Sequence, residues 1–131
     1  MRVVLDTNVL VSAFWSEHNR LTRIIDMLVS GILLPCYCQE IIQEYQDVLS
    51  RPRLAFHFEE ASVNEIINKI KADGICVAVR PSSIPLIDES DRIFYDVAVA
   101  CGAQLVTGNI KHYPKKPFIL TPFEFLSGQG N

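Results

Sequence analysis

The feature that most constrains the fold is an alternation along the chain of short apolar runs and longer segments with helical periodicity. The apolar runs lack polar alternation, which is typical of strands buried on both faces of a sheet. The longer segments repeat apolar residues at intervals of three and four, as at Leu21, Ile24 and Leu28, so each has one buried face. We expect strands at 2–5, 32–36, 75–79, 104–107 and 118–120, and helices at 21–29, 39–50, 63–70 and 91–101.

Strands separated by helices predict a parallel sheet, because parallel neighbours need a crossover connection. We therefore predict an α/β fold, a three-layer α/β/α sandwich around a parallel sheet of about five strands. The length of 131 residues is that of one domain, covering residues 1–131. Gly31 and Gly102 are expected to stop helices, and Gly74 to end another in the left-handed conformation. A capping box at 121–124 predicts a last helix.

Composition excludes several classes of protein. The net charge of −3 excludes nucleic-acid binding by bulk positive charge, so such a role would need a local basic rim. No uncharged stretch approaches the roughly 20 apolar residues of a spanning helix, and no cleavage site follows the apolar N-terminus. We therefore expect no membrane association and a cytoplasmic location. The four cysteines form no Cys-x-x-Cys pair and are interpreted as small core residues.

Polar residues cluster where two predicted strands end. Residues 6–8 (Asp-Thr-Asn) follow the first strand, and residues 107–109 (Thr-Gly-Asn) follow the fourth. Ligands of open parallel sheets bind beyond the carboxyl ends of the strands. These two segments are therefore the first candidates for a functional site.

Asp6 is the most informative residue of the sequence. It directly follows Val-Val-Leu and precedes another apolar run, where burial of a carboxylate is costly. The alternative is a helix N-cap, a position that Asp, Thr and Asn all favour. One helix needs one cap, so three candidate caps in succession favour a functional role for Asp6.

Glu44 is the acid of its helix that could lean over the sheet edge. At about 100° per residue, it lies at the edge of the apolar arc centred near Tyr45, whereas Glu40 and Asp47 point away. A solvated charge on the helix flank is an equally good interpretation of this pattern.

Asp91 begins a predicted helix, where a carboxylate can also serve as a cap. Asp96 interrupts the apolar part of the same helix and is expected to face the sheet edge or solvent. Asp88 and Glu89 are interpreted as solvated loop charges.

Carboxylates that converge repel one another unless positive charge lies between them. No lysine or histidine occurs at the strand ends to supply it. A hard dication with oxygen ligands, Mg²⁺ or Mn²⁺, is the natural counter-charge. Such an ion can activate water and stabilise a phosphate, so the acids predict phosphodiester hydrolysis.

Other catalytic signatures are missing. The chain has no phosphate-binding Gly-x-x-x-x-Gly-Lys loop, no Gly-x-Gly-x-x-Gly and no Gly-x-Ser-x-Gly. His18, His57 and His112 share no ligand spacing and are interpreted as surface residues, although His112 could contact a phosphate. A haloacid-dehalogenase-like phosphatase would have a second Asp at the position of Asn8. A response-regulator receiver would have an Asp where the chain has Val79-Arg80.

Three stretches and one glutamate together form a recognisable pattern. They are Val-Val-Leu-Asp6-Thr7-Asn8-Val-Leu, Glu44, Asp91-Arg-Ile-Phe-Tyr-Asp96-Val-Ala and Leu-Val-Thr107-Gly108-Asn109. The pattern resembles that of the PIN-domain ribonucleases, over residues 2 to about 125, and most closely that of the VapC-related toxins. The resemblance implies a five-stranded parallel sheet and a metal-dependent endoribonuclease. It also implies a homodimer or higher oligomer that is silenced by an antitoxin.

The resemblance also assigns roles to individual residues. By it, Asp6, Glu44 and Asp91 are the core metal ligands and catalytic acids, Asp96 or Asn109 completes the pocket, and Asn8 and Thr107 orient ligands or waters. Many relatives have Asp where this chain has Asn109, and an amide is a weaker ligand for a hard cation. Asp96 would then supply the missing charge for a second metal.

RNA would be held by positive groups around the acids, because phosphate contacts dominate affinity. The candidates are Arg51, Arg53, Arg80, Arg92, Lys111, Lys115 and Lys116. Single-stranded RNA or an RNA loop is the expected target, because unstacked bases are accessible there. The rival hypothesis is an inactive PIN-fold module that binds RNA or a protein partner. The acids Asp6, Glu44 and Asp91 argue against it, whereas Asn109 leaves it open.

Overall fold

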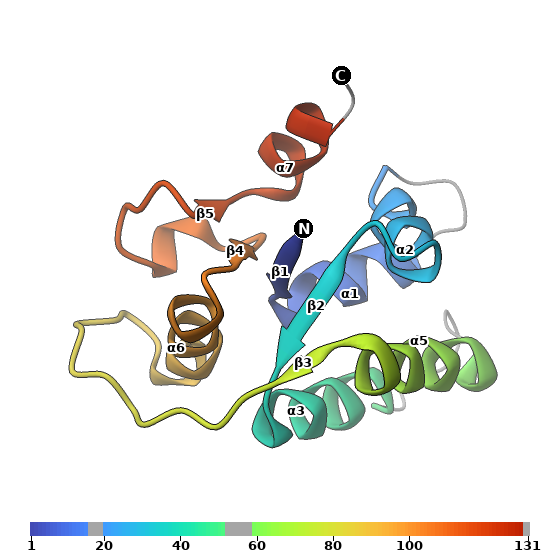
Figure 1. The fold of residues 1–131 in the computed structure, drawn as a ribbon, viewed down its shortest axis with the longest axis horizontal. Helices are drawn as coiled ribbons and strands as arrows, with labels where there is room; N and C mark the ends of the chain where they lie inside the picture. Colours follow the sequence, from blue (N-terminus) through green and yellow to red (C-terminus); the bar gives the residue numbers. More distant parts are fainter. Residues whose placement is uncertain (16–19, 52–58, 130–131) are drawn as a thin grey trace.

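The centre of the molecule is a sheet of five parallel strands in the order β3-β2-β1-β4-β5. The structure is a computed structural model that describes residues 1–15, 20–51 and 59–129. The strands are β1 (Arg2–Leu5), β2 (Leu34–Tyr37), β3 (Ile75–Cys76), β4 (Gln104–Val106) and β5 (Ile119–Leu120). The predicted parallel five-stranded sheet is confirmed (Figure 1).

Six helices and two 3₁₀ turns of the described residues surround the sheet. They are α1 (Thr7–Trp15), α2 (Thr22–Val29), α3 (Gln39–Leu49), α5 (Glu60–Asp73), α6 (Arg92–Cys101), α7 (Pro122–Gln129), η1 (Glu89–Asp91) and η2 (Ile110–His112). Helix α1 was not predicted from the sequence. Its residues are apolar on most sides, so no periodic stripe marks it as a helix.

The helices lie in two layers on either side of the sheet. Right-handed crossovers place α1, α2, α3 and α5 on one face, because β1, β2 and β3 follow one another in a single direction across the sheet. The connection from β3 to β4 runs in the opposite direction and places α6 on the other face. Figure 1 shows α6 on the side of the sheet away from α1, α2 and α5, and α6 contacts β1, β2 and β4 as well as α3. The predicted three-layer α/β/α arrangement is thus confirmed.

Two local predictions differ from the structure around β3. The predicted strand at 75–79 is shorter, because β2 ends at Tyr37 and leaves only Val77 N–H to bond Tyr37 O at 2.9 Å. Gly74 was predicted to be left-handed and instead has φ −81°. A Cβ there would lie 2.4 Å from Ile70 O and 2.6 Å from Pro35 O, so close backbone contact requires glycine.

Other local predictions hold. Gly31 and Gly102 end their helices with φ of 84° and 60°. The capping box is reciprocal: Thr121 N–H donates to Glu124 Oε1 at 2.9 Å, and Glu124 N–H to Thr121 Oγ1 at 3.1 Å. No helix within the described ranges has the length and apolar character needed to span a membrane.

The cysteine prediction is correct for three of the four residues. Cys36, Cys38 and Cys101 are buried in the core, whereas Cys76 is exposed at the end of the edge strand β3. An edge strand has a neighbour on one side only, so its last residue remains open to solvent.

Candidate functional site

The candidate site lies at the carboxyl ends of β1 and β4, the central strands of the sheet. The chain order reverses there, because β2 and β3 lie on one side of β1 whereas β4 and β5 lie on the other. Such a switch point opens a crevice beyond the strand ends. Asn8 joins the two strand ends, because its Oδ1 accepts a hydrogen bond from Gly108 N–H at 2.9 Å.

Asp6 is buried directly beyond β1 and is 5% exposed. Its Oδ2 accepts hydrogen bonds from Thr107 Oγ1 at 2.8 Å and from Tyr113 Oη at 3.0 Å. Both bonds come from the segment after β4. A side chain that reaches across the sheet in this way differs from the N-cap alternative, in which it would bond the first turn of α1.

The two hydroxyls that hold Asp6 are themselves fixed. Thr107 is fully buried, and its Oγ1 also accepts a hydrogen bond from Asn109 N–H at 3.0 Å. Burial, followed by the nearby charges of Asp6 and Asp91, raises the pKa of Tyr113 far above its usual value. The phenol therefore keeps its proton and remains a donor to Asp6.

Glu44 reaches the same edge from α3. Tyr45 Oη donates to Leu5 O at 2.5 Å and fixes the helix against the end of β1. Thr7 Oγ1 donates to the Glu44 carboxylate, which is half-buried, as expected at the edge of the apolar arc. Burial raises the pKa of Glu44, and the charge of Asp6 adds to this, whereas the Thr7 hydrogen bond and Arg51 oppose it.

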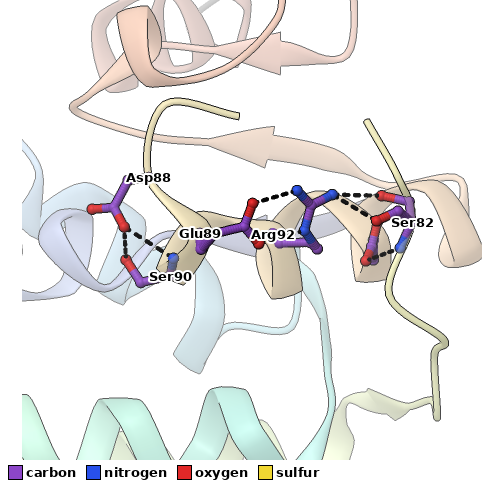
Figure 2. Close-up of polar contacts among 6 residues, drawn as sticks. Ser82, Asp88, Glu89, Ser90 and Arg92 are labelled. Atoms are coloured by element: carbon purple, nitrogen blue, oxygen red, sulfur yellow. Dashed lines mark hydrogen bonds and ion pairs between the residues drawn. The ribbon is translucent and has the colours of Figure 1, made fainter. Parts of the chain in front are cut away.

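Asp91 is the third acid, at the junction of η1 and α6. It is 8% exposed, and its side chain makes no capping hydrogen bond, so the cap interpretation does not apply. Burial and then the charges of Asp6 and Asp88 raise the pKa of Asp91 to about 6, although His112 opposes the rise. The local cap is instead Asp88, whose Oδ1 accepts from Ser90 N–H at 2.9 Å and Ser90 Oγ at 2.8 Å (Figure 2).

The structure does not bring Asp96 into this group. Five positions separate it from Asp91, which is about 500°, or about 140° around the helix axis. Its Oδ2 accepts a hydrogen bond from Ser82 N–H at 3.0 Å. Arg92 contacts the same segment through Ser82 O at 2.7 Å and also pairs with Glu89, as Figure 2 shows. Asp96 and Arg92 therefore hold the 77–88 segment, and neither the metal role of Asp96 nor the RNA role of Arg92 fits these contacts.

Of the remaining predicted site residues, some lie near the acids and others lie away from them. Arg51 is exposed beside Glu44, and Lys111 is exposed beside the cluster of acids, within η2. Asn109 is exposed between Thr107 and η2. Lys115 and Lys116 lie just before β5, at the amino ends of the parallel strands, whereas the site lies at their carboxyl ends. Arg80 lies in the 77–88 segment. Arg53 lies outside the described residues.

The donor set fits a divalent cation. The charges of Asp6 and Asp88 both raise the pKa of Glu44 and the pKa of Asp91, so they disfavour the charged forms of these two acids. Asp91 Oδ2 is buried and has no hydrogen-bond partner among the described residues; the one other such side-chain atom is Gln104 Oε1, at the amino end of β4. An unsatisfied buried oxygen costs about 1–3 kcal/mol. A hard dication would satisfy this oxygen and compensate the repulsion.

Sequence reasoning missed four members of the site: Thr7, Asp88, His112 and Tyr113. For two of them, Asp88 and His112, the sequence spacing contains a signal that could have found them. Asp88 and His112 lie three positions from Asp91 and Asn109, and such pairs share a side of a 3₁₀ turn. Thr7 and Tyr113 gave no comparable signal, because each is defined by a partner distant in sequence.

Comparison with known proteins supports the same interpretation. A family model described as "PIN domain" matches residues 2–111, a range that contains every acid of the site. A search of curated proteins found no match. Membership of this family indicates nuclease activity in general terms. Because the match covers most of the chain, this protein belongs to the PIN-domain family.

Proposed function

We propose that the protein is a divalent-metal-dependent endoribonuclease that hydrolyses RNA phosphodiester bonds. The observation that carries this proposal is a chain of contacts that links the three acids: Thr7, next to Asp6, donates to Glu44, Tyr113 donates to Asp6, and the adjacent His112 lies 3.3 Å from Asp91. Acids from three distant segments are difficult to explain by folding alone, because the charge of Asp6 raises the cost of ionising both Glu44 and Asp91.

Asp6, Glu44 and Asp91 would hold Mg²⁺ or Mn²⁺, since all three offer carboxylate oxygens. The chemistry that such an ion supplies is polarisation of a phosphate and a lowered pKa of water. Asn109 would then act through its backbone N–H on Thr107 rather than as a ligand.

The neighbouring hydroxyls are positioning residues in this proposal. Thr107 and Tyr113 both donate to Oδ2 of Asp6, so neither occupies Oδ1. Thr7 fixes the Glu44 carboxylate, and Asn8 fixes the backbone at Gly108. Ligands held by such contacts need little reorganisation when a cation binds.

RNA is the proposed substrate because the family is one of nucleases and the motifs resemble its ribonucleases. Arg51 and Lys111 are the cations best placed to contact phosphates near the acids. From the same resemblance we infer a cytoplasmic toxin of a type II toxin–antitoxin pair, which forms a homodimer and is inhibited by its antitoxin.

The test is cleavage of mixed single-stranded RNA in Mg²⁺ or Mn²⁺ by the parent protein and by Asp6→Asn, Glu44→Gln and Asp47→Asn. We expect loss of cleavage in the first two variants. Asp47→Asn is the matched control, because this exposed acid of α3 bonds Gln43 and lies outside the site. Growth arrest on induction, relieved by Glu44→Gln and not by Asp47→Asn, tests the toxin.

Equal cleavage by all four proteins would indicate a contaminating nuclease and contradict the proposal. Absence of cleavage by the parent, together with RNA binding, would favour the inactive PIN-fold module. That alternative has one observation in its favour, namely that Asn109 stands where a fourth carboxylate is expected.

A further inference from the structure

A histidine lies beside the acids at the edge of the candidate site. His112 ends η2, and its Nδ1 lies 3.3 Å from Oδ2 of Asp91. One donor atom from each of Asp88, Asp91 and His112 lies within 4.8 Å of the other two. Asp91 ends η1, Asp88 caps it, and the histidine comes from the segment after β4, so the fold rather than local sequence brings the histidine to the acids.

The buried oxygen of Asp91 is an independent sign of a ligand at this place. Asp91 is 8% exposed, and Oδ2, the oxygen that faces His112, accepts no hydrogen bond from the described residues. The imidazole nitrogen lies 3.3 Å from this oxygen, which is the distance of an ion pair when His112 is protonated. A cation between Oδ2 and Nδ1 would satisfy both atoms.

The separations suit coordination of a single ion. Two ligands bound at about 2.1 Å and at right angles lie about 3.0 Å apart, and opposite ligands lie about 4.2 Å apart. The 3.3 Å separation of the Asp91 and His112 atoms is close to the value for neighbouring ligands. Asp88 can take part, because its bonds to Ser90 use Oδ1 and leave Oδ2.

We propose that His112 is a metal ligand, with Asp91 and Asp88, and that this nitrogen donor makes the site prefer Mn²⁺ to Mg²⁺. Imidazole favours transition-metal ions, whereas Mg²⁺ is bound almost entirely by oxygen. The inference rests on the proposed function, because Asp91 belongs to both ligand sets. His112 thus takes the part for which Asn109 is unsuited.

The test is pulsed electron paramagnetic resonance of the full chain with Mn²⁺, which detects a nitrogen bound to the metal independently of activity. We expect nitrogen coupling in the parent and its loss in His112→Gln. His18→Gln and His57→Gln are the matched controls, because they remove the two other histidines of the chain. Circular dichroism checks that each variant is folded.

A second variant tests whether the nitrogen donor itself, rather than the presence of a ligand at position 112, sets the preference for Mn²⁺. His112→Asp should bind Mn²⁺ without nitrogen coupling, and calorimetry should show the preference for Mn²⁺ over Mg²⁺ reduced about tenfold. An unchanged preference in His112→Asp would overturn the proposal.

The outcomes distinguish this proposal from the proposed function. Mn²⁺ binding without nitrogen coupling in the parent, or coupling that persists in His112→Gln, would overturn the role of His112. The carboxylate site and RNA cleavage would remain intact in that case. Absence of both metal binding and cleavage would overturn the two proposals together.

Discussion

Two buried acids of one helical segment, Asp91 at the start of α6 and Asp96 in its middle, show how differently a carboxylate can be used. Asp91 and Asp96 are 8% and 7% exposed. Asp96 accepts a hydrogen bond from Ser82 N–H and lies near the charge of Arg92. Asp91 instead faces Asp6 and Asp88, and its Oδ2 has no hydrogen-bond partner among the described residues.

The comparison teaches that burial of an acid does not by itself identify a functional site. What differs is the charge of the surroundings: a backbone N–H and a cation satisfy Asp96, whereas Asp91 lies near two carboxylates, Asp6 and Asp88, and a histidine, His112. A satisfied acid stabilises the fold, and an unsatisfied one stores a cost that a ligand can remove. The two residues should therefore respond in opposite ways to the same isosteric change.

The largest expected difference between them is in catalysis. Asp91→Asn should lower the rate of RNA cleavage in Mg²⁺ or Mn²⁺ by about three orders of magnitude, because a lost ligand removes several kcal/mol of transition-state stabilisation. Asp96→Asn should stay within about twofold of the parent, because its carboxylate contacts the 77–88 segment and not the site. Initial rates per mole of folded protein measure both. Equal losses of cleavage rate in the two variants would contradict the assignment of Asp91 to the site and of Asp96 to the fold.

The next difference is in stabilisation by metal. An ion at about 100 times its dissociation constant stabilises the folded state by about 2.7 kcal/mol. We expect this gain with Mn²⁺ for the parent and for Asp96→Asn, and little of it for Asp91→Asn. Thermal unfolding followed by circular dichroism, with and without Mn²⁺, measures the gain. An equal stabilisation of Asp91→Asn by Mn²⁺ would mean that the ion binds elsewhere.

The fold was largely predictable because its causes are local. Apolar runs such as 2–5, helical periodicity and the turn glycines Gly31 and Gly102 are all visible in the sequence. The failures have physical reasons. Helix α1 is apolar on most sides and therefore has no periodic stripe. Glycine is required at position 74 because a Cβ there would contact Pro35 O, in a residue distant in sequence.

The site was predictable only in part because its contacts are not local. Asp6, Glu44 and Asp91 could be found from strand ends and helix faces. Periodicity alone could not separate Asp91 from Asp96, because the partner of Asp96 is Ser82, in an irregular segment. Tyr113 was missed for the same reason, since its bond to Asp6 spans more than a hundred residues.

The smallest expected difference is in stability without metal. Asp96→Asn replaces a charged acceptor for Ser82 N–H by a neutral one and should lower the free energy of unfolding by about 1 kcal/mol. Asp91→Asn should cost nothing or stabilise the protein, because it removes charge from a repulsive cluster. Urea unfolding in EDTA measures both values.

The control for this last comparison is Glu89→Gln, at the exposed end of the same network. Glu89 pairs with Arg92 at 2.6 Å, but its side chain is 74% exposed, so solvent screens the pair and no measurable change is expected. A loss in Glu89→Gln as large as in Asp96→Asn would mean that Arg92, rather than the buried acid, anchors the 77–88 segment. A loss in Asp91→Asn as large as in Asp96→Asn would mean that both acids serve the fold, and the unpartnered oxygen would no longer indicate a ligand.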